Sequence, residues 1–511
     1  MKKLFKLLFS RIVIVSFLIL LQLFVIFLVA IRFTEYFVYY YLAALLLSLV
    51  LTLRIVNRRD AVEYKIAWLC TVLLFPLFGA FLYLIFSGNR LTKRSKKKMA
   101  TITEAMGQSL ERNDALTETL AAENPSAASQ SRYISDYALC PLYQNTEVRY
   151  FPLGEDMFPV LIEELEKAEK YIFLEYFIIG EGRMWNTIHE ILKRKAAQGV
   201  DVRLIYDDMG CIMLLPVNYD KTLRAEGIRC HVFNRFIPIL SARLNNRDHR
   251  KIGVVDGRVA FTGGVNFADE YINEKVRFGH WKDNSVMLRG DAAWSMTVMF
   301  LTMWDYLDGV RGSKDSYAVY RPAPTPVAAA HGWVQPYTDN PLDDEAVGER
   351  IYLNMINRAE RYIWITTPYL VIDGQLESAL CNAAKCGVDV RIVTPGIADK
   401  FIVYEATKSY YEHLIRNGVK IYQYTPGFMH AKTFLCDDRY ATVGTVNLDF
   451  RSLYLHFECG VWMCDTDVIG PIRDDFEAVF QKSQFITLAD CVKGFWRDLF
   501  RAVMALIAPL M

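Results

Sequence analysis

Two short segments of the chain place a histidine, a lysine and an aspartate at the same spacing. The sets are His249, Lys251 and Asp256 in HRKIGVVD, and His430, Lys432 and Asp437 in HAKTFLCD. Alternate side chains of an extended strand share a face, so each histidine points the same way as the lysine two positions later. Each segment thus sets an imidazole beside a fixed cation. Two such segments brought together suit a phosphate diester, because one imidazole can attack phosphorus while the other protonates the leaving alkoxide.

Other residues of the two segments have expected places around the same phosphate. Lys251 and Lys432 are expected to neutralise the non-bridging oxygens, whose charge grows as phosphorus becomes five-coordinate. Asn266 and Asn447 each follow a glycine turn downstream of a motif. Each asparagine either donates a hydrogen bond to the same oxygens or only stabilises its turn.

The aspartate that completes each set lies where an apolar strand gives way to a turn. Asp256 follows Ile252, Val254 and Val255, and Asp437 follows a similar apolar stretch. This place favours a structural role within the set, in which the carboxylate ties the strand end to a neighbouring backbone or basic group.

The motifs belong to two halves of the chain that repeat each other. AEKYIFLEYFII (168–179) and GVDVRLIYDD (199–208) precede the first motif, while AERYIWITTPYLV (359–371) and GVDVRIVTPG (387–396) precede the second. A helix is predicted between the two strands of each half, at 184–198 and 376–386. Strands that alternate with helices predict an α/β fold with a largely parallel or mixed sheet in each half.

The paired motifs resemble those of the phospholipase D superfamily. GGVNFADEY (263–271) and NLDFRS (447–452) make the chain similar to the bacterial cardiolipin synthases within it. The resemblance implies two duplicated α/β halves that pack as a pseudodimer with the motifs at their interface. It also implies a phosphohistidine intermediate and no metal or other cofactor.

The resemblance adds two acids and a division of roles. Asp283 and Glu458 each precede a closing apolar strand, where an acid of related enzymes orients the catalytic histidine. The alternative is a strand-end acid that faces solvent. The resemblance favours His249 as the nucleophile and His430 as the acid, although the pseudosymmetry leaves the reverse assignment open.

The implied activity is cardiolipin synthase: transfer of a phosphatidyl group from one phosphatidylglycerol to another, with glycerol released. A phospholipase D-type hydrolase, or a phosphatidyltransferase with another alcohol acceptor, would keep the same residues. A non-catalytic membrane scaffold would be expected to lose a histidine or lysine, and both sets are complete. The formal net charge of +1 and the absence of a basic stripe argue against a nucleic-acid partner.

The N-terminal residues 1–98 are predicted to anchor the protein in the membrane. Apolar segments at 12–31, 36–53 and 66–86 are long enough to suggest helices that cross a bilayer. A cleaved signal peptide is the alternative for the first segment. The third segment, interrupted by Pro76 and Gly79, either crosses or is re-entrant or interfacial.

Basic clusters beside these segments predict a multi-pass protein of the bacterial plasma membrane with a cytoplasmic catalytic region. The cluster at 90–98 either binds anionic lipids or serves only as a topogenic flank. Ten scattered cysteines without a disulfide framework agree with a reducing compartment. Cys436, inside the second motif, is interpreted as a core residue.

The remaining chain is divided by composition. Residues 99–135 are predicted to form a helical linker, 136–320 the first half, 321–332 a proline-rich joint and 333–511 the second half. The second half ends in an amphipathic helix with apolar residues at helical spacing from Phe495 to Ile507. That helix either lies on the bilayer or, as the more ordinary interpretation, packs against the catalytic core.

Overall fold

The computed structural model places most of the chain. It describes residues 37–58, 60–87, 93–236, 246–309, 314–323, 326–328, 330–343, 345–491 and 494–510, with residues 20, 24, 27, 28 and 31. The predicted apolar segment 12–31 lies outside the described residues except for those five positions.

The first half of the catalytic region is built on a seven-stranded mixed sheet. Its strands lie in the order β1-β8-β6-β5-β2-β3-β4. Strands β2, β3 and β4 are parallel, and the others are antiparallel to their neighbours. Their bounds are β1 (Thr146–Phe151), β2 (Tyr171–Tyr176), β3 (Asp201–Asp207), β4 (Arg229–Phe233), β5 (Lys251–Val255), β6 (Val259–Gly263) and β8 (Ser285–Gly290).

The second half repeats this sheet and adds an edge strand. The order β9-β18-β16-β15-β10-β12-β13 matches the first sheet strand for strand, and β19 follows β13. The duplication and the mixed sheets predicted from the sequence are therefore confirmed. The bounds are β9 (Trp333–Asp339), β10 (Tyr362–Thr366), β12 (Asp389–Pro395), β13 (Lys420–Tyr424), β15 (Thr433–Cys436), β16 (Tyr440–Gly444), β18 (Glu458–Cys464) and β19 (Ser483–Ile486).

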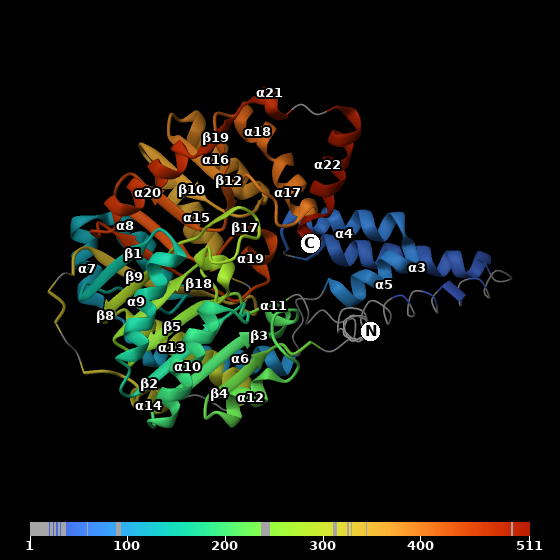
Figure 1. Cartoon of the computed structure of the whole chain (residues 1–511). Coiled ribbons are helices and arrows are strands. Elements are labelled where there is room, and N and C mark those ends of the chain that lie inside the picture. The colour runs from blue at the N-terminus through green and yellow to red at the C-terminus, as the bar shows by residue number, and fades with distance from the viewer. Residues whose placement is uncertain are drawn as a thin grey trace.

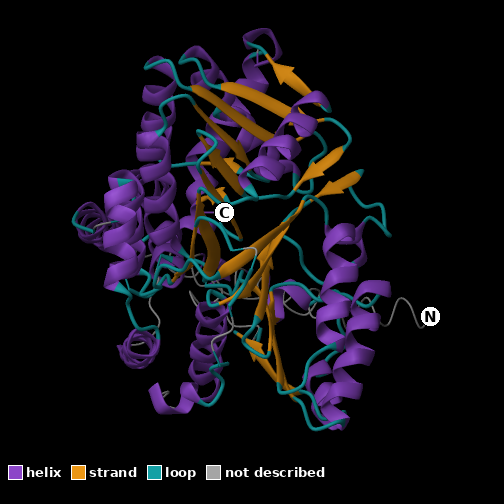
Figure 2. Cartoon of the chain, turned by 90° about the vertical axis from the view of Figure 1, so that its left-hand side faces the viewer, coloured by secondary structure: helices purple, strands orange, loops and turns teal. Residues whose placement is uncertain are grey.

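Helices cover the two sheets, and the strands run through the middle of the catalytic region (Figure 2). In the first half α9 (Gly154–Glu166) and α10 (Arg183–Ala197) contact the sheet, as does α13 (Ala293–Asp308). Every residue from 293 to 304 is buried. A helix that is apolar around its whole circumference is stable only when covered on all sides. Helix α13 is accordingly enclosed by the first sheet, α6 (Lys93–Ser109) and β9.

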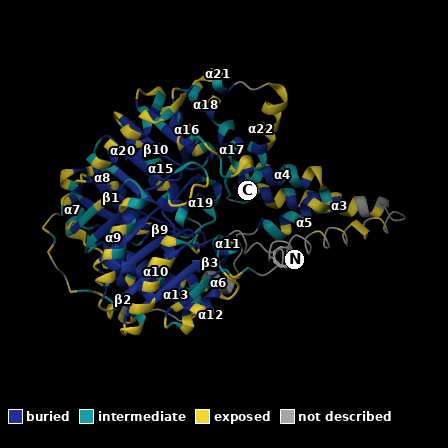
Figure 3. Cartoon of the chain, viewed as in Figure 1, coloured by how far each residue is buried: buried dark blue, intermediate teal, exposed yellow. Residues whose placement is uncertain are grey.

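The second half uses equivalent helices. They are α15 (Val347–Arg358), α16 (Gly374–Lys385) and α20 (Ile469–Gln481). The predicted helices at 184–198 and 376–386 correspond to α10 and α16. Figure 3 shows that the strands are buried and that exposed residues gather on the outer helices. The smaller elements are α11 (Asp208–Cys211), α12 (Tyr219–Ala225), η3 (Asp269–Ile272), α14 (Lys314–Ala318), α18 (Tyr411–Arg416), α19 (Phe450–Tyr454) and α21 (Leu488–Cys491).

The halves are joined by short strands of one half that pair with strands of the other. β7 (His280–Lys282) of the first half pairs in parallel with β14 (Gly427–Met429) of the second. Asp248 of the first half forms a parallel bridge with Phe457 of the second. A further short pair, β11 (Leu370–Val371) with β17 (Leu448–Asp449), lies within the second half. The two motif segments thus lie at the junction of the halves.

The predicted linker is helical and belongs to the catalytic core. It contains most of α6, all of α7 (Asp114–Glu123) and most of α8 (Pro125–Tyr137). Their apolar side chains, such as Met106 and Ile134, are buried in the cluster that includes both sheets. These helices are therefore packed on the two halves rather than spanning a gap. The exact domain boundaries stay a prediction.

The N-terminal helices form a separate bundle beside the second half and next to the C-terminus (Figure 1). Of the predicted segment 36–53, residues 37–53 lie in α3 (Phe37–Val56), and residue 36 is outside the described residues. The segment 66–86 falls in two helices, α4 (Val62–Leu74) and α5 (Pro76–Phe86), which meet at the interruption expected at Pro76. Within the part of the chain that the structure describes, no helix combines the length and hydropathy needed to cross a membrane.

The C-terminal helix lies against the N-terminal bundle. α22 (Phe495–Ile507) contacts α4 and α17 (Phe401–Ser409), and the terminal turn η4 (Ala508–Leu510) also contacts α4. The predicted amphipathic helix is thus present, and the direction of its apolar face matters for function.

Candidate active site

The exchange of strands brings each motif histidine beside the acid of the other half. The backbone amide of His249 donates to the carbonyl of Phe457 at 3.0 Å, next to Glu458 in sequence. The amide of His430 donates to the carbonyl of Lys282 at 2.7 Å, next to Asp283. An equivalent backbone hydrogen bond therefore places each motif histidine next to an acid of the other half.

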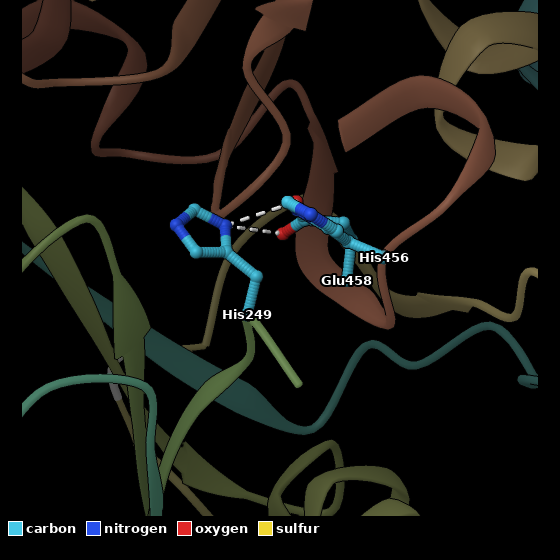
Figure 4. A group of neighbouring side chains, drawn as sticks. All are labelled: His249, His456 and Glu458. Carbon is cyan, nitrogen blue, oxygen red and sulfur yellow. Dashed lines mark hydrogen bonds and ion pairs between the residues drawn. The ribbon is translucent and has the colours of Figure 1, made fainter. Parts of the chain in front are cut away.

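Glu458 holds His249 by its Nδ1 atom. The Nδ1 atom lies 2.9 Å and 3.0 Å from the two carboxylate oxygens (Figure 4). The hydroxyl of Thr445 donates to the second oxygen, and the Glu458 side chain is fully buried. A carboxylate that accepts from Nδ1 keeps the proton there and leaves Nε2 with a free lone pair.

Asp283 holds His430 in the equivalent way. Its Oδ2 lies 2.5 Å from Nδ1 of His430. Burial would raise the pKa of Asp283, but the His430 and Lys432 side chains outweigh it, so the pKa lies below its ordinary value. Both acids are fully buried. The alternative in which they face solvent is therefore wrong.

A glycine turn makes room for one of these carboxylates. A Cβ atom added at Gly264 would lie 1.9 Å from Oδ1 of Asp283. No side chain fits at that distance, so the second glycine of the turn is required by the close approach of the acid. The glycine turn seen in the sequence thus leaves room for the acid that orients His430.

The two lysines are buried in the same site. Nζ of Lys251 donates to the carbonyl of His249 at 2.6 Å, and Nζ of Lys432 donates to the carbonyl of His430. Burial lowers the pKa of Lys251 to about 8 and that of Lys432 to about 7, although nearby carboxylates oppose this. Near neutral pH both side chains are therefore protonated in part, and the protonated fraction depends on pH.

The histidines are neutral in the unliganded enzyme. Burial, followed by the charges of Lys251 and Lys432, holds the pKa of His249 well below its ordinary value. Burial and Lys432 lower the pKa of His430 to about 4, against the opposing effect of Asp283. Each imidazole is influenced by the lysine of the other motif, so the two motifs share one electrostatic environment.

The two motif aspartates lie at the far ends of their strands. Asp256 accepts hydrogen bonds from the backbone amides of residues 169, 170 and 171 at 2.7–2.8 Å. Asp437 accepts from those of residues 360, 361 and 362 at 2.8 Å. Five residues of strand at about 3.3 Å each place Asp256 roughly 16 Å from Lys251. This geometry supports the structural role that was predicted for both.

The two asparagines differ. Asn266 uses both ends of its amide, since Oδ1 accepts from Ile178 N at 3.0 Å and Nδ2 donates to the Tyr271 hydroxyl at 2.9 Å. Asn447 is buried, and among the described residues its side chain has no hydrogen-bond partner. Asn266 thus fits the turn interpretation, whereas the amide of Asn447 is free to meet a ligand.

Sequence reasoning missed a third histidine beside the site. His456 lies two positions before Glu458, and its ring centroid is 5.7 Å from that of His249. Together with Glu458, the two histidines place one ligand atom each within 4.8 Å of one another, a set that can hold zinc. The ammonium groups of Lys251 and Lys432 share this site, and their charge favours an anion over a divalent cation.

A cavity of about 740 Å³ lies between the N-terminal bundle and the second half, away from both motifs. Its lining includes Tyr64, Tyr454 and several carboxylates, among them Glu349 and Asp373. None of the motif histidines or lysines lines it. The hydrogen-bonded histidine–acid pairs, rather than this cavity, mark the site where chemistry can occur.

Comparisons with known proteins agree with this geometry. The family model described as "Cardiolipin synthase, PLD-like domain" matches residues 161–282 and 352–480, one match in each half. A second model, "Phospholipase_D-nuclease N-terminal", matches residues 46–88. Each motif set thus lies within one of the two matched domains.

Relatives cover nearly the whole chain. An uncharacterized protein of Streptococcus mutans is 43% identical over 465 residues, which is 90% of this chain and 99% of the relative. Cardiolipin synthase of Geobacillus kaustophilus is 34% identical over 471 residues, 92% of each chain. The crystal structure of phosphatidylserine synthase of Haemophilus influenzae has a TM-score of 0.58 at 12% identity, over 75% of this chain and 100% of that one, which shows a shared fold alone. The chain therefore belongs to the cardiolipin synthase family of the phospholipase D superfamily and is a phosphatidyltransferase of that family.

Proposed function

We propose that the protein is a cardiolipin synthase that joins two phosphatidylglycerol molecules and releases glycerol. The observation that carries the proposal is the pair of buried histidines, each held at Nδ1 by an acid of the other half, with two lysines in the same site. Relatives named cardiolipin synthase cover nearly the whole chain. A phosphodiester fits between such groups as an anion that both lysines attract.

The first step forms a covalent intermediate on His249. Its Nε2 attacks the phosphorus of one phosphatidylglycerol, and the bond from phosphorus to the glycerol oxygen breaks. His430 gives its Nε2 proton to the departing alkoxide, so that neutral glycerol leaves. Lys251 and Lys432 stabilise the additional charge on the non-bridging oxygens.

The second step reverses these roles. His430, now neutral, takes the proton from the terminal hydroxyl of a second phosphatidylglycerol. That oxygen attacks phosphorus, the phosphorus–nitrogen bond breaks, and His249 is restored. The product is cardiolipin, and no other reactant is needed because one phosphodiester bond is exchanged for another.

The surroundings of the two imidazoles support this assignment of roles. Among the described residues, Nδ1 of His249 is bonded to carboxylate oxygens alone, which increases the electron density at Nε2. Nδ1 of His430 lies 2.9 Å from the ammonium of Lys432 as well as beside Asp283. The cation withdraws electron density from this ring, which suits a proton donor.

The bound phosphate supplies the charge that a general acid needs. In the free enzyme, cations and burial hold the pKa of His430 at about 4. An anionic phosphodiester beside Lys251 and Lys432 offsets their repulsion of a protonated imidazole. The pKa of His430 therefore rises when substrate binds, and proton donation becomes possible at neutral pH.

We further propose that the enzyme works at the membrane surface with α22 against the lipid. The apolar side of this helix faces outward, with Phe495 73% and Trp496 79% exposed. Its arginines bind the protein instead, since both pair with Glu405 of α17: the half-exposed Arg497 at 2.6 Å and the buried Arg501 at 3.0 Å. This inverted arrangement favours the bilayer alternative for the helix over simple packing on the core.

The neighbouring elements extend the same surface. Phe401 and Ile402 of α17 are exposed beside α22, and Phe401 stacks on Phe500. Helix α3 exposes further leucines, and Figures 1 and 3 show it on the same side of the molecule as α22. Exposed apolar residues on several neighbouring helices are expected of a protein whose substrates are anchored lipids. The membrane location and topology remain part of the proposal.

The experiment that tests the mechanism uses a donor with a leaving group that needs no acid. A phosphatidyl diester of p-nitrophenol releases nitrophenolate without protonation. We expect the His430→Ala protein to give one burst of nitrophenolate and to retain the phosphatidyl group on His249, detectable in the peptide by mass spectrometry. His249→Ala should give no burst. A burst in His249→Ala with the label on His430 would reverse the roles, and no label on either would contradict the covalent mechanism.

A parallel assay with labelled phosphatidylglycerol identifies the acceptor. Wild-type protein should form cardiolipin and glycerol in equal amounts. Phosphatidic acid as the main product would make the enzyme a hydrolase. Product formed only after addition of another alcohol would make it a phosphatidyltransferase with a different acceptor.

A further inference from the structure

Two arginines and a histidine lie beside the His249 end of the site and take no part in the two steps above. Arg247 is two residues before His249, and Arg451 belongs to the NLDFRS segment. Their backbones are connected through the second half, because the amide of Phe457 donates to the Arg247 carbonyl and that of His456 donates to the Arg451 carbonyl. The charge of Arg247 acts on Arg451, and that of Arg451 acts on His456.

The side chain of Arg247 is buried beside two carboxylates, those of Asp207 and Asp208. Its side chain is 5% exposed, yet among the described residues Nη1 has no hydrogen-bond partner. The carboxylate of Asp207 lies 3.9 Å away. Both Asp207 oxygens accept backbone amides, and burial raises the pKa of this acid to about 7. Asp207 is therefore only partly ionised near neutral pH, and Asp208 is the other carboxylate that acts on the guanidinium charge.

Arg451 and His456 also have unused hydrogen-bonding groups. Within the described chain, the Arg451 side chain makes no hydrogen bond, although Asp449 is close enough to act on its charge. Asp449 itself uses Oδ1 to accept the backbone amides of Arg451 and Ser452. Among the described residues neither ring nitrogen of His456 has a hydrogen-bond partner, although Nδ1 lies 3.7 Å from Oε1 of Glu458. Arg451 is half-buried, whereas Nη1 of Arg247 and the His456 ring nitrogens are buried, and buried polar atoms without a partner are costly unless a ligand satisfies them.

We propose that Arg247, Arg451 and His456 bind the phosphate of the acceptor lipid while its hydroxyl attacks the phosphohistidine. This inference rests on the proposed function. The donor phosphate is already matched by two histidines and two lysines, so a second group of anion-binding residues needs a second anion. The acceptor in cardiolipin synthesis carries one, whereas water or a simple alcohol does not.

The dimensions of the acceptor fit this arrangement. In phosphatidylglycerol the terminal hydroxyl is five bonds from phosphorus, a span of about 6 Å at roughly 1.5 Å per bond with the usual bond angles. The rings of His249 and His456 are 5.7 Å apart. His456 therefore lies about one headgroup length from the residue that carries the phosphatidyl group. An acceptor that is recognised by its phosphate would also be preferred over water, which has no phosphate.

The test compares two acceptors in one reaction. The full-length protein is given labelled phosphatidylglycerol in mixed micelles with 1-butanol, which accepts a phosphatidyl group and has no phosphate. The readout is the ratio of cardiolipin to phosphatidylbutanol. We expect the ratio to fall at least tenfold in Arg451→Gln and to recover in part in Arg451→Lys. Arg258→Gln, an exposed arginine in the turn between β5 and β6, is the matched control and should keep the wild-type ratio.

Arg247→Gln is the second variant, used after its thermal unfolding shows that it is folded, and should also lower the ratio. Equal loss of both products in Arg451→Gln, or an unchanged ratio, would overturn the inference. Wild-type protein that makes phosphatidylbutanol but no cardiolipin would instead contradict the proposed function itself.

Inorganic phosphate separates a lipid headgroup from a free anion. For a lipid headgroup site, phosphate should lower the cardiolipin ratio of the wild type, with relief by more phosphatidylglycerol and no effect in Arg451→Gln. A ratio that phosphate lowers regardless of the lipid concentration would show a site for the free anion, and would overturn the acceptor role.

Discussion

The replacement of Glu458 by glutamine gives the sharpest test of how the site works. The glutamine side chain has the same shape and keeps an oxygen that can accept from Nδ1 of His249, so the imidazole can remain oriented. What is lost is one buried negative charge. In the proposed first step His249 becomes positively charged as its Nε2 bonds to phosphorus, and that charge depends on Glu458.

The size of the effect follows from the distance. With both carboxylate oxygens 2.9–3.0 Å from Nδ1, the centres of the two charges are about 4 Å apart. At an effective dielectric constant of about 20, this attraction is worth about 4 kcal/mol. A transition state that loses it is reached about 10³-fold more slowly. We therefore expect kcat of Glu458→Gln to fall about a thousandfold, with a small change in KM.

The assay is cardiolipin formation from phosphatidylglycerol at constant surface concentration, corrected for the folded fraction of each variant. Asp256→Asn is the matched control, because it also converts a motif-associated carboxylate to an amide. Asp256 binds three backbone amides far from the histidines, so this change should cost about 1–3 kcal/mol of unfolding free energy. Its kcat should stay within a few-fold of wild type. A Glu458→Gln enzyme with more than a tenth of wild-type kcat would refute the charge argument, and a thousandfold loss in folded Asp256→Asn would refute the structural role of that residue.

Three further outcomes are expected. The value of kcat/KM should decline above about pH 7, because Lys432 (pKa about 7) and then Lys251 (pKa about 8) lose the charge that attracts phosphate, and a pH–rate profile that is flat to pH 9 would contradict this. Gly264→Ala should lower kcat at least tenfold, because its Cβ displaces the carboxylate of Asp283, and normal kcat would show that the turn adapts. Hydrogen exchange of α22 should slow when vesicles of phosphatidylglycerol are added, whereas that of α10 should not change; equal behaviour of both helices would argue against the proposed lipid contact.

Local patterns in the sequence predicted much of the fold. The strands before each motif and the helix between them follow from runs of buried apolar residues, and their repetition predicts two equivalent sheets. The partners of each histidine could not be predicted in the same way. Asp283 lies 147 residues from His430 and Glu458 lies 209 residues from His249. Only the pairing of β7 with β14, and of residue 248 with 457, decides that the acids are exchanged between halves.

Residues that matter because they lack hydrogen-bond partners could not be recognised from the sequence either. Arg247, Arg451 and His456 occupy no repeated spacing, and an arginine near a turn is usually a solvated surface residue. Their lack of side-chain hydrogen-bond partners among the described residues becomes apparent only when segments of both halves meet. The C-terminal helix shows the same limit, because its periodicity predicts two faces but does not say which one the protein covers.

The duplicated halves differ where the chemistry requires a difference. Both motifs have the same residues at the same spacing, so symmetry alone would make the two histidines equivalent. The structure gives His249 a glutamate that contacts Nδ1 through both oxygens, and gives His430 an aspartate together with a lysine ammonium 2.9 Å from Nδ1. Since one reaction needs both an electron-rich nitrogen and a proton donor, these unequal surroundings allow one duplicated fold to supply both roles. Arg247 and Arg451 also lie beside His249, the residue that carries the phosphatidyl group when the acceptor attacks.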